Sequence, residues 1–128
     1  MKLSIVALFG ATFLFLGVLL GALGSHFLTE KISPESLQSF RIATRYMLIH
    51  GLALLFLPVI PYLTDPQKLN AGLYLLIGTG LFSLSILVLS TKEWHGFSVS
   101  YLGPITPIGG LCLLVGWGYV ILQLIKSL

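Results

Sequence analysis

The side chains that could bind an anion or carry a proton are few and concentrated. The chain has three histidines and only two arginines, Arg41 and Arg45, which are four residues apart. On a helix, side chains at this spacing share one face, so the two guanidinium groups repel each other unless a negative charge lies between them. A nearby acid or an anionic ligand could supply that charge. The acids in question are Glu30, Glu35 and Glu93.

A second anion-binding feature precedes the last apolar run. Residues 103–110 read GPITPIGG, so two glycines follow Thr106 in the first turns of an expected helix. The first N–H groups of a helix have no partner within it, and an uncovered helix start favours an anion. We therefore predict a site for an anion near one membrane face. Its candidate ligand-binding residues are Arg45, His50, His26, Arg41, Ser83, Thr106, Gly109 and Gly110.

Each of these residues also has a purely structural interpretation. Arg45 could donate to carbonyl groups at the end of the first helix, near Gly24 and Ser25, or pair with a loop glutamate. Histidines at such positions commonly serve as hydrogen-bonding groups. Ser83 and Thr106 could be interhelical or capping donors. The spacing alone leaves both interpretations open.

The composition disfavours catalysis, metal binding and nucleic-acid binding. No nucleophile, base and orienting group occur at an interpretable spacing, so we predict no enzyme and no catalytic residue. The single cysteine, Cys112, excludes an intramolecular disulfide, and no cluster of cysteine and histidine has metal-ligand spacing. We expect no cofactor and no metal. The formal charge of +3 is too scattered for contact with nucleic acid.

The elements that must position these residues are membrane helices. Of the 128 residues, 56% are hydrophobic and 9% are charged, which is too little charge to coat a small soluble domain. A bilayer core about 30 Å thick takes about 20 helical residues, and four apolar runs of that length are present. The runs lack the alternation of barrel strands. The first run is too long for a signal peptide, so we expect it to be retained.

We therefore predict an all-α fold, an integral membrane four-helix bundle with antiparallel neighbours and both termini on the same side. One transmembrane domain is expected over residues 1–128, with helices over about 3–28, 34–63, 66–90 and 107–126. Residues 91–104 carry three aromatic side chains and are expected to be a surface loop at the membrane interface.

Local motifs mark the expected helix starts. Ser33 precedes Pro34 and an acid, the pattern of an N-cap residue, a proline in the first turn and a negative charge near the positive end of the helix dipole. The pairs Asp65–Pro66 and Thr106–Pro107 predict the starts of the third and fourth helices in the same way.

Glycine spacing indicates close helix packing. Gly10, Gly17 and Gly24 recur every seven residues, and Gly109 and Gly116 repeat that interval near the C-terminus. Small residues let membrane helices approach closely, which matters because apolar burial drives little association in lipid. These faces serve either the interior of the bundle or a homo-oligomer, and the spacing does not decide between them.

The polar residues are unevenly divided between the two membrane faces. In a bundle of four spans, both termini and the connection near Asp65 lie on one side, here called side A, and the other two connections lie on side B. All three histidines, both arginines and three of the four acids belong to the half that adjoins side B. Any polar site is therefore predicted at the side-B mouth of the bundle.

Several of these residues fall in segments that match a known family. The segments are 21–26 (GALGSH), 44–46 (TRY), 50–55 (HGLALL), 81–85 (LFSLS), 103–110 (GPITPIGG) and 116–117 (GW). The chain resembles the YgdD/YwdK-type bacterial membrane proteins, a family of unknown function that includes the eukaryotic transmembrane protein 256 as a relative. The resemblance covers nearly the whole chain. It implies a multi-pass protein of the cell membrane and brings no activity, cofactor or catalytic residue.

Three functions fit these observations. The first is a non-enzymatic membrane protein that binds an anionic lipid headgroup or a small anion at the side-B pocket. The second is a small oligomeric membrane transporter, although no carboxylate lies within a span to couple a proton. The third is a membrane scaffold or assembly factor. The expected partners are the lipid bilayer, an anionic lipid and further copies of the chain, and not nucleic acid.

Overall fold

The structure is a computed structural model that describes residues 1–128 and consists of helices and their connections. Its α-helices are α1 (Leu3–His26), α2 (Pro34–Phe56), α3 (Asp65–Thr79), α4 (Ser85–Ser90), α5 (Lys92–His95) and α6 (Ile105–Lys126). Its short 3₁₀ turns are η1 (Leu28–Glu30), η2 (Leu57–Val59) and η4 (Ser100–Leu102). A π-helical turn, η3 (Gly80–Leu84), joins α3 to α4.

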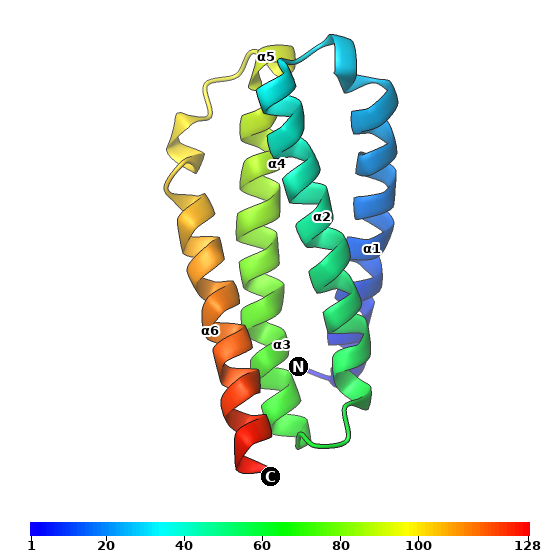
Figure 1. The fold of residues 1–128 in the computed structure, drawn as a ribbon, viewed down its shortest axis with the longest axis vertical. Helices are drawn as coiled ribbons and strands as arrows, with labels where there is room; N and C mark the ends of the chain where they lie inside the picture. The colour runs from blue at the N-terminus through cyan, green and yellow to red at the C-terminus, as the bar shows by residue number, and fades with distance from the viewer.

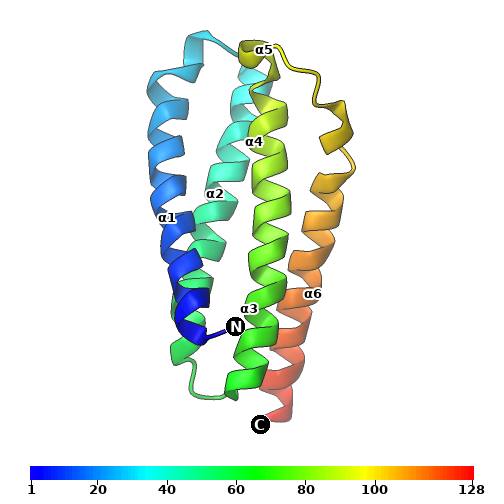
Figure 2. The same cartoon turned by 180° about the vertical axis from the view of Figure 1, so that it is seen from behind.

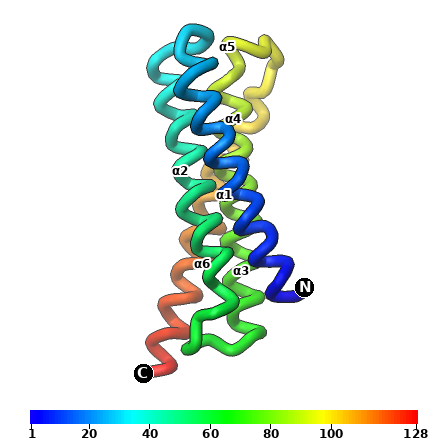
Figure 3. Tube along the Cα trace, turned by 90° about the vertical axis from the view of Figure 1, so that its right-hand side faces the viewer, coloured from blue at the N-terminus to red at the C-terminus, as the bar shows by residue number.

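Four segments are long and apolar enough to cross a membrane. They are Leu3–His26, Pro34–Val59, Asp65–Ser90 and Ser100–Lys126, so α3, η3 and α4 together make the third span. The spans run side by side, and both termini lie toward the end of the bundle that is remote from α5 (Figures 1 and 3). The prediction of an all-α membrane bundle with both termini on side A is confirmed.

The helix starts agree with the predicted capping at one position and differ at two. Ser33 caps α2, and its hydroxyl accepts from the N–H of Ser36 at 3.2 Å. The cap of α3 is Thr64 rather than Asp65, and the Thr64 N–H donates to the Oε1 of Gln67 at 2.8 Å. Helix α6 begins at Ile105, before Thr106, because Pro104 already supplies the fixed φ of a helix start, at −65°.

The third span and the connection after it contain details that the sequence did not predict. The span covers Asp65–Ser90, and the π-turn η3 lies within it. The connection over residues 91–104, expected as a surface loop, contains the short helix α5 and the turn η4. Gly96 follows α5 with a φ of 72°, a left-handed conformation that ends the helix and favours glycine.

Glycines form a close seam between α1 and α2. A Cβ placed on Gly10 would lie 2.5 Å from the backbone N of Leu55, and one on Gly51 would lie 2.9 Å from the carbonyl oxygen of Gly10. The next two glycines of the seven-residue series continue the seam, since Gly17 faces Leu48 and Gly24 faces the ring of Phe40. Without side chains at these points the two backbones can pack directly on each other.

A second glycine seam joins α6 to the third span. A Cβ on Gly109 would fall against the backbone N of Phe82, and one on Gly78 would lie 2.8 Å from the backbone N of Leu113. Gly116 meets Tyr74 and Leu75 in the same way. The recurring glycines therefore lie in the interior of the bundle. The sequence had left open whether they serve the interior or a homo-oligomer.

Helix α6 occupies an edge of the bundle. It packs against α3, η3 and α4, and its backbone makes no close approach to α1 or α2. In both ribbon views α6 and α1 stand on opposite sides of the third span (Figures 1 and 2). Between α2 and α6 only side chains meet, and this space contains part of the candidate site.

The glycine seams predict a sharp difference between two glycines of α6. Gly109→Ala should lower the free energy of unfolding by about 1–3 kcal/mol, because the new methyl group overpacks the backbone of Phe82. Gly118→Ala should leave it unchanged or raise it, since no atom lies within 4 Å of a Cβ there. Thermal unfolding of both variants in detergent micelles measures the difference. Equal midpoints for the two variants would contradict the seam.

Candidate functional site

An aromatic cluster of Tyr46, His50, Phe82 and Trp117 connects α2, the third span and α6. The Tyr46 ring lies 4.4 Å from that of Phe82 and stacks on His50 with ring centroids 5.4 Å apart. Trp117 reaches across from α6, and its indole Nε1 donates to the Nε2 of His50 at 3.1 Å. The sequence indicated His50 as a candidate site residue, but it did not indicate Trp117 as its hydrogen-bond partner.

The two hydrogen bonds of His50 determine its protonation state. Because Trp117 donates to Nε2, that nitrogen must be unprotonated, and Nδ1 therefore carries the hydrogen and donates to the carbonyl oxygen of Tyr46 at 2.9 Å. His50 is thus neutral, and both of its ring nitrogens have partners. The side chain is 6% exposed. His50 therefore joins α2 to α6 by a hydrogen bond, and neither of its ring nitrogens is free to bind an anion.

The cluster borders a groove between α2 and α6. The groove has a volume of about 800 Å³ and is lined mostly by apolar side chains. Gly110 lines it directly, and Gly109 lies against Phe82 at its edge. The lining also includes Tyr46, Ile49, His50, Phe82, Pro107, Leu111, Leu113, Leu114 and Trp117.

Arg41 and Arg45 lie on another side of α2. Both are exposed, whereas His50 is buried. At about 100° per residue, the five positions from Arg45 to His50 correspond to a rotation of about 140° around the helix. Neither guanidinium forms a hydrogen bond or an ion pair within the chain, whose only ion pair joins Lys68 to Asp65. The structure therefore does not bring the arginines into one pocket with His50, and neither pairs with a loop glutamate.

Two other predicted ligand residues are also separate from the groove. His26 ends α1 and is exposed. Ser83 is fully buried in η3, and its hydroxyl has no hydrogen-bond partner. Neither residue lines the space between α2 and α6.

Thr106 belongs to a small polar cleft on side B. Its hydroxyl lies 2.7 Å from the hydroxyl of Ser85, so the side chain bridges α6 to α4 instead of leaving the helix start open. The cleft has a volume of about 340 Å³ and contains one acid and one base, Glu35 and Lys92. The sequence predicted a polar site at side B with arginine and histidine among its residues, and no arginine or histidine lines this cleft.

A carboxylate of the chain itself occupies the start of α2. The Oε2 of Glu93 accepts from the N–H of Ser33 at 2.8 Å, and its Oε1 accepts from the hydroxyl groups of Ser33 and Ser36. This contact joins α5 to α2 and uses the positive end of the α2 dipole. Sequence reasoning considered Glu93 only as a counter-charge for the arginines. The two serines at the helix start were the signal for the observed contact.

These contacts change the titration of Glu93. The hydrogen bonds from the Ser36 hydroxyl and the Ser33 backbone lower the pKa of the carboxyl group below its ordinary value of 4.5. Each bond favours the ionised form. The contact between α5 and α2 is therefore intact at neutral pH and weakens when the carboxyl group is protonated.

No arrangement of side chains in the structure supports a specific reaction. The only histidine in the groove has both nitrogens engaged, and no serine or cysteine lines the groove beside it. No three histidine, cysteine, aspartate or glutamate side chains come together in a group that could hold a metal ion. What the structure does offer is a groove within the membrane and two unpaired guanidinium groups near one face.

The fold and this polar pattern define a small multi-pass membrane protein with four spanning helices. The chain belongs to the family described as protein of unknown function (DUF423), whose model matches residues 20–110. It is similar over 98% of its length to UPF0382 membrane proteins of Staphylococcus aureus, at 37% identity over 98% of the relative, and of Staphylococcus haemolyticus, at 35% identity over 98%. It is also 31% identical to the UPF0382 membrane protein YwdK of Bacillus subtilis, over 98% of this chain and 100% of YwdK. No solved structure gives a significant match.

Glu93 should make stability depend on pH in the acidic range. Because its pKa is lowered by folding, the stabilisation is complete above its ordinary pKa of 4.5 and is lost as the pH falls through the lowered value. Thermal midpoints measured from pH 7 to pH 3 should differ between the wild type and Glu93→Gln at neutral pH and converge in acid. Glu30→Gln, at an exposed loop acid, should follow the wild type. A gap between wild type and Glu93→Gln that stays constant with pH would refute the contact.

The bond between His50 and Trp117 should appear as a coupling energy. His50→Phe and Trp117→Phe each remove one partner, so the double variant should lose less than the sum of the single losses. We expect a coupling of about 1 kcal/mol, typical of interhelical hydrogen bonds in membranes. Unfolding of the four proteins of the cycle in micelles measures it. Additive losses would show that the two side chains do not interact.

Proposed function

We propose that the protein is a non-enzymatic membrane protein that binds the headgroup of an anionic lipid at side B through Arg41 and Arg45. The observation that carries this proposal is the pair of exposed guanidinium groups one helical turn apart that have no acidic partner in the chain. Like charges at this spacing destabilise a helix unless an anion lies between them. A phosphate group supplies that charge and matches the planar donor array of arginine.

The depth of the two arginines supports a lipid as the source of the phosphate. At 1.5 Å per residue, they lie about 10 and about 16 Å along α2 from Pro34. The span Pro34–Val59 has 26 residues and exceeds what the hydrocarbon core requires, so its first turns reach the headgroup layer. Arg41 is then at the boundary of the hydrocarbon, and Arg45 one turn deeper can extend its side chain back toward the surface.

The surface beside the arginines has room for a headgroup. Gly24 faces Phe40 and Gly17 faces Leu48, so the part of α1 between these glycines runs alongside residues 40–48 of α2. Gly21 lies within that part, and no atom lies within 4 Å of a Cβ placed on it. The surface of α1 is therefore unoccupied at Gly21, at the level of Arg41 and Arg45.

The other predicted ligand residues have different roles in this proposal. Hydrogen bonds within the protein satisfy His50 and Thr106, and Gly109 is needed for close packing. The anion site is therefore smaller than the sequence suggested and consists of the arginine pair. No specific observation favours a transporter or a scaffold over this function.

Native mass spectrometry of protein released from nanodiscs tests the proposal. In a mixture of phosphatidylcholine and phosphatidylglycerol, the wild type should retain phosphatidylglycerol. The comparison is made in a Lys31→Gln background, so that this separate side-B cation does not contribute to binding. With about 1 kcal/mol contributed by each basic residue near an anionic surface, the preference should fall about 30-fold when Arg41→Gln/Arg45→Gln is added. Added inorganic phosphate should not displace the lipid, whereas displacement would identify a free anion as the ligand.

A matched pair of lysines on side A provides the control. Lys2→Gln/Lys126→Gln removes the same charge at the other membrane face and should keep the lipid preference. If the arginine variant retains its preference with an unchanged thermal midpoint, the arginines do not bind lipid. If that variant loses its fold, Arg41→Lys/Arg45→Lys keeps the charge and should restore most of the binding, and failure to do so would also contradict the proposal.

A further inference from the structure

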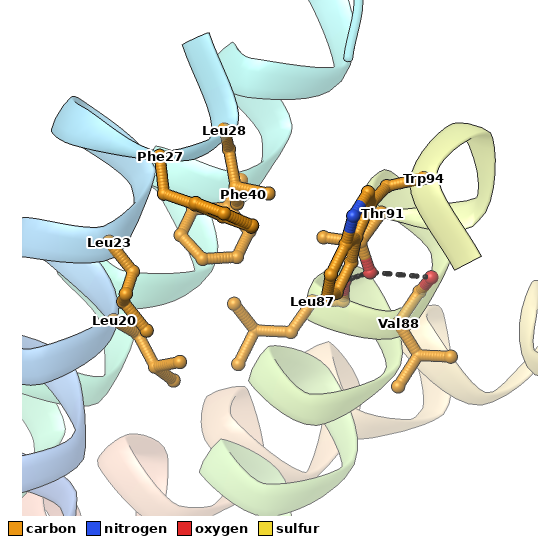
Figure 4. Close-up of a pocket in the computed structure, with 9 residues that line it drawn as sticks. All are labelled: Leu20, Leu23, Phe27, Leu28, Phe40, Leu87, Val88, Thr91 and Trp94. Atoms are coloured by element: carbon orange, nitrogen blue, oxygen red, sulfur yellow. Dashed lines mark hydrogen bonds between the residues drawn. The ribbon is translucent and has the colours of Figure 1, made fainter. Parts of the chain in front are cut away.

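An apolar cavity lies between the side-B ends of α1 and the third span. Neither arginine lines it, and it shares no lining residue with the groove that holds His50. It has a volume of about 410 Å³. Figure 4 shows side chains of α1 on one side and those of α4 and α5 on the other, with Phe40 and Leu28 between them. The lining residues are Leu20, Leu23, Phe27, Leu28, Phe40, Leu87, Val88, Thr91 and Trp94.

The cavity exists because α1 approaches the third span at only one end. On side A, α1 packs closely on α3, where Val6 fills the space left by Gly72. Toward side B, α1 makes no close approach to α4. Phe40 of α2 lies in the notch at Gly24 and forms the inner wall, but it does not fill the space between the two helices.

The interior of the cavity has no free polar group. Thr91 is its only polar lining residue, and its hydroxyl donates to the carbonyl oxygen of Leu87 at 2.7 Å. A polar occupant would lose its hydrogen bonds to water without gaining new ones. The lining therefore favours an apolar occupant such as a hydrocarbon chain.

The rim, in contrast, carries two donors without acceptors. The rings of Phe27 and Trp94 meet edge to face at 5.5 Å, and the ammonium group of Lys31 lies 4.8 Å above the Phe27 ring. Lys31 has no ion pair. The Trp94 side chain is 55% exposed, and its indole N–H has no hydrogen bond within the chain. Tryptophan and lysine in this arrangement are typical of the headgroup layer.

We propose that this cavity seats one acyl chain of an anionic bilayer phospholipid, with the phosphate at Lys31 and the indole N–H of Trp94 available to an ester oxygen. The cavity supplies the apolar surface, and the rim supplies the complementary charge. A single anionic phospholipid carries both an apolar chain and a negative charge, so it matches the apolar lining of the cavity and the unpaired ammonium group of Lys31 together. The site is independent of the arginine pair.

Quenching of Trp94 by brominated acyl chains tests the proposal. Trp117→Phe leaves Trp94 as the only tryptophan and changes no residue of the cavity. The vesicles contain mostly phosphatidylcholine and a small fraction of phosphatidylglycerol that is brominated on its acyl chains. Quenching of Trp94 should exceed the quenching expected if lipids contacted it in proportion to their abundance. Filling the cavity with Leu20→Phe and Val88→Phe should remove the excess quenching. The matched control, Val18→Phe and Leu73→Phe at lipid-exposed positions, should keep it.

Lys31→Gln tests the charge at the rim without altering the cavity. It should reduce the preference for brominated phosphatidylglycerol over brominated phosphatidylcholine about fivefold. Arg41→Gln/Arg45→Gln should not affect the quenching, so the result does not depend on the headgroup site at α2. Two results would overturn the proposal: quenching of Trp94 in the Trp117→Phe protein that only matches the share of brominated lipid, or excess quenching that persists in the filled variant. If the filled variant does not fold, an unchanged preference in Lys31→Gln overturns it.

Discussion

In hydrocarbon a polar group has no water to bond with, and this constraint organises nearly every polar contact of the protein. Hydroxyl groups within the spans bond back to their own helix, as Thr12 does to Leu8 and Thr79 does to Leu75. Lys68 is nearly buried because its ammonium group donates to the carbonyl oxygen of Pro58 at 2.9 Å and thereby caps the end of the second span. Most polar side chains in the spans therefore serve the fold.

The exceptions are informative because the same constraint makes them costly. Ser83 is fully buried without a partner and lies in the π-turn η3, whereas Thr79 in the preceding α-helix donates to the carbonyl oxygen of Leu75. Arg41 and Arg45 differ from Ser83 because they face outward, where a partner can reach them. The unpaired hydroxyl lies inside the bundle, whereas the two charges are at its surface and have no acidic partner within the chain.

Composition and periodicity were sufficient to predict the architecture. Uncharged runs of membrane length identify the spans, and the seven-residue glycine series indicates close helix packing, because both depend only on the local sequence. The series did not show whether the partner helix belongs to the same chain. Ser33 was recognised as a cap for the same reason. The π-turn was not predicted, since residues 80–84 carry no pattern that separates a π-turn from an α-helix.

The candidate site was harder to predict because it depends on which helices are neighbours. Arg45 and His50 share one half of a span, but helical geometry places them on different sides, and grouping them by depth alone combined two separate features. The link from His50 to Trp117 spans 67 positions in the sequence. It becomes visible only when α6 is known to lie at the edge next to α2. Glu93 was likewise placed by the path of α5 rather than by any spacing.

Close packing at the glycines also explains where the bundle is open. The seams draw α1 against α2 and α6 against the third span, so each pair is joined almost backbone to backbone. Larger side chains, such as Tyr46 and Phe82, meet between the two pairs and leave spaces unfilled. The groove of about 800 Å³ and the cavity of about 410 Å³ both lie along these wider contacts. Ligand sites in helix bundles are commonly built between the helices, so the close pairing at the glycines also determines where such spaces lie.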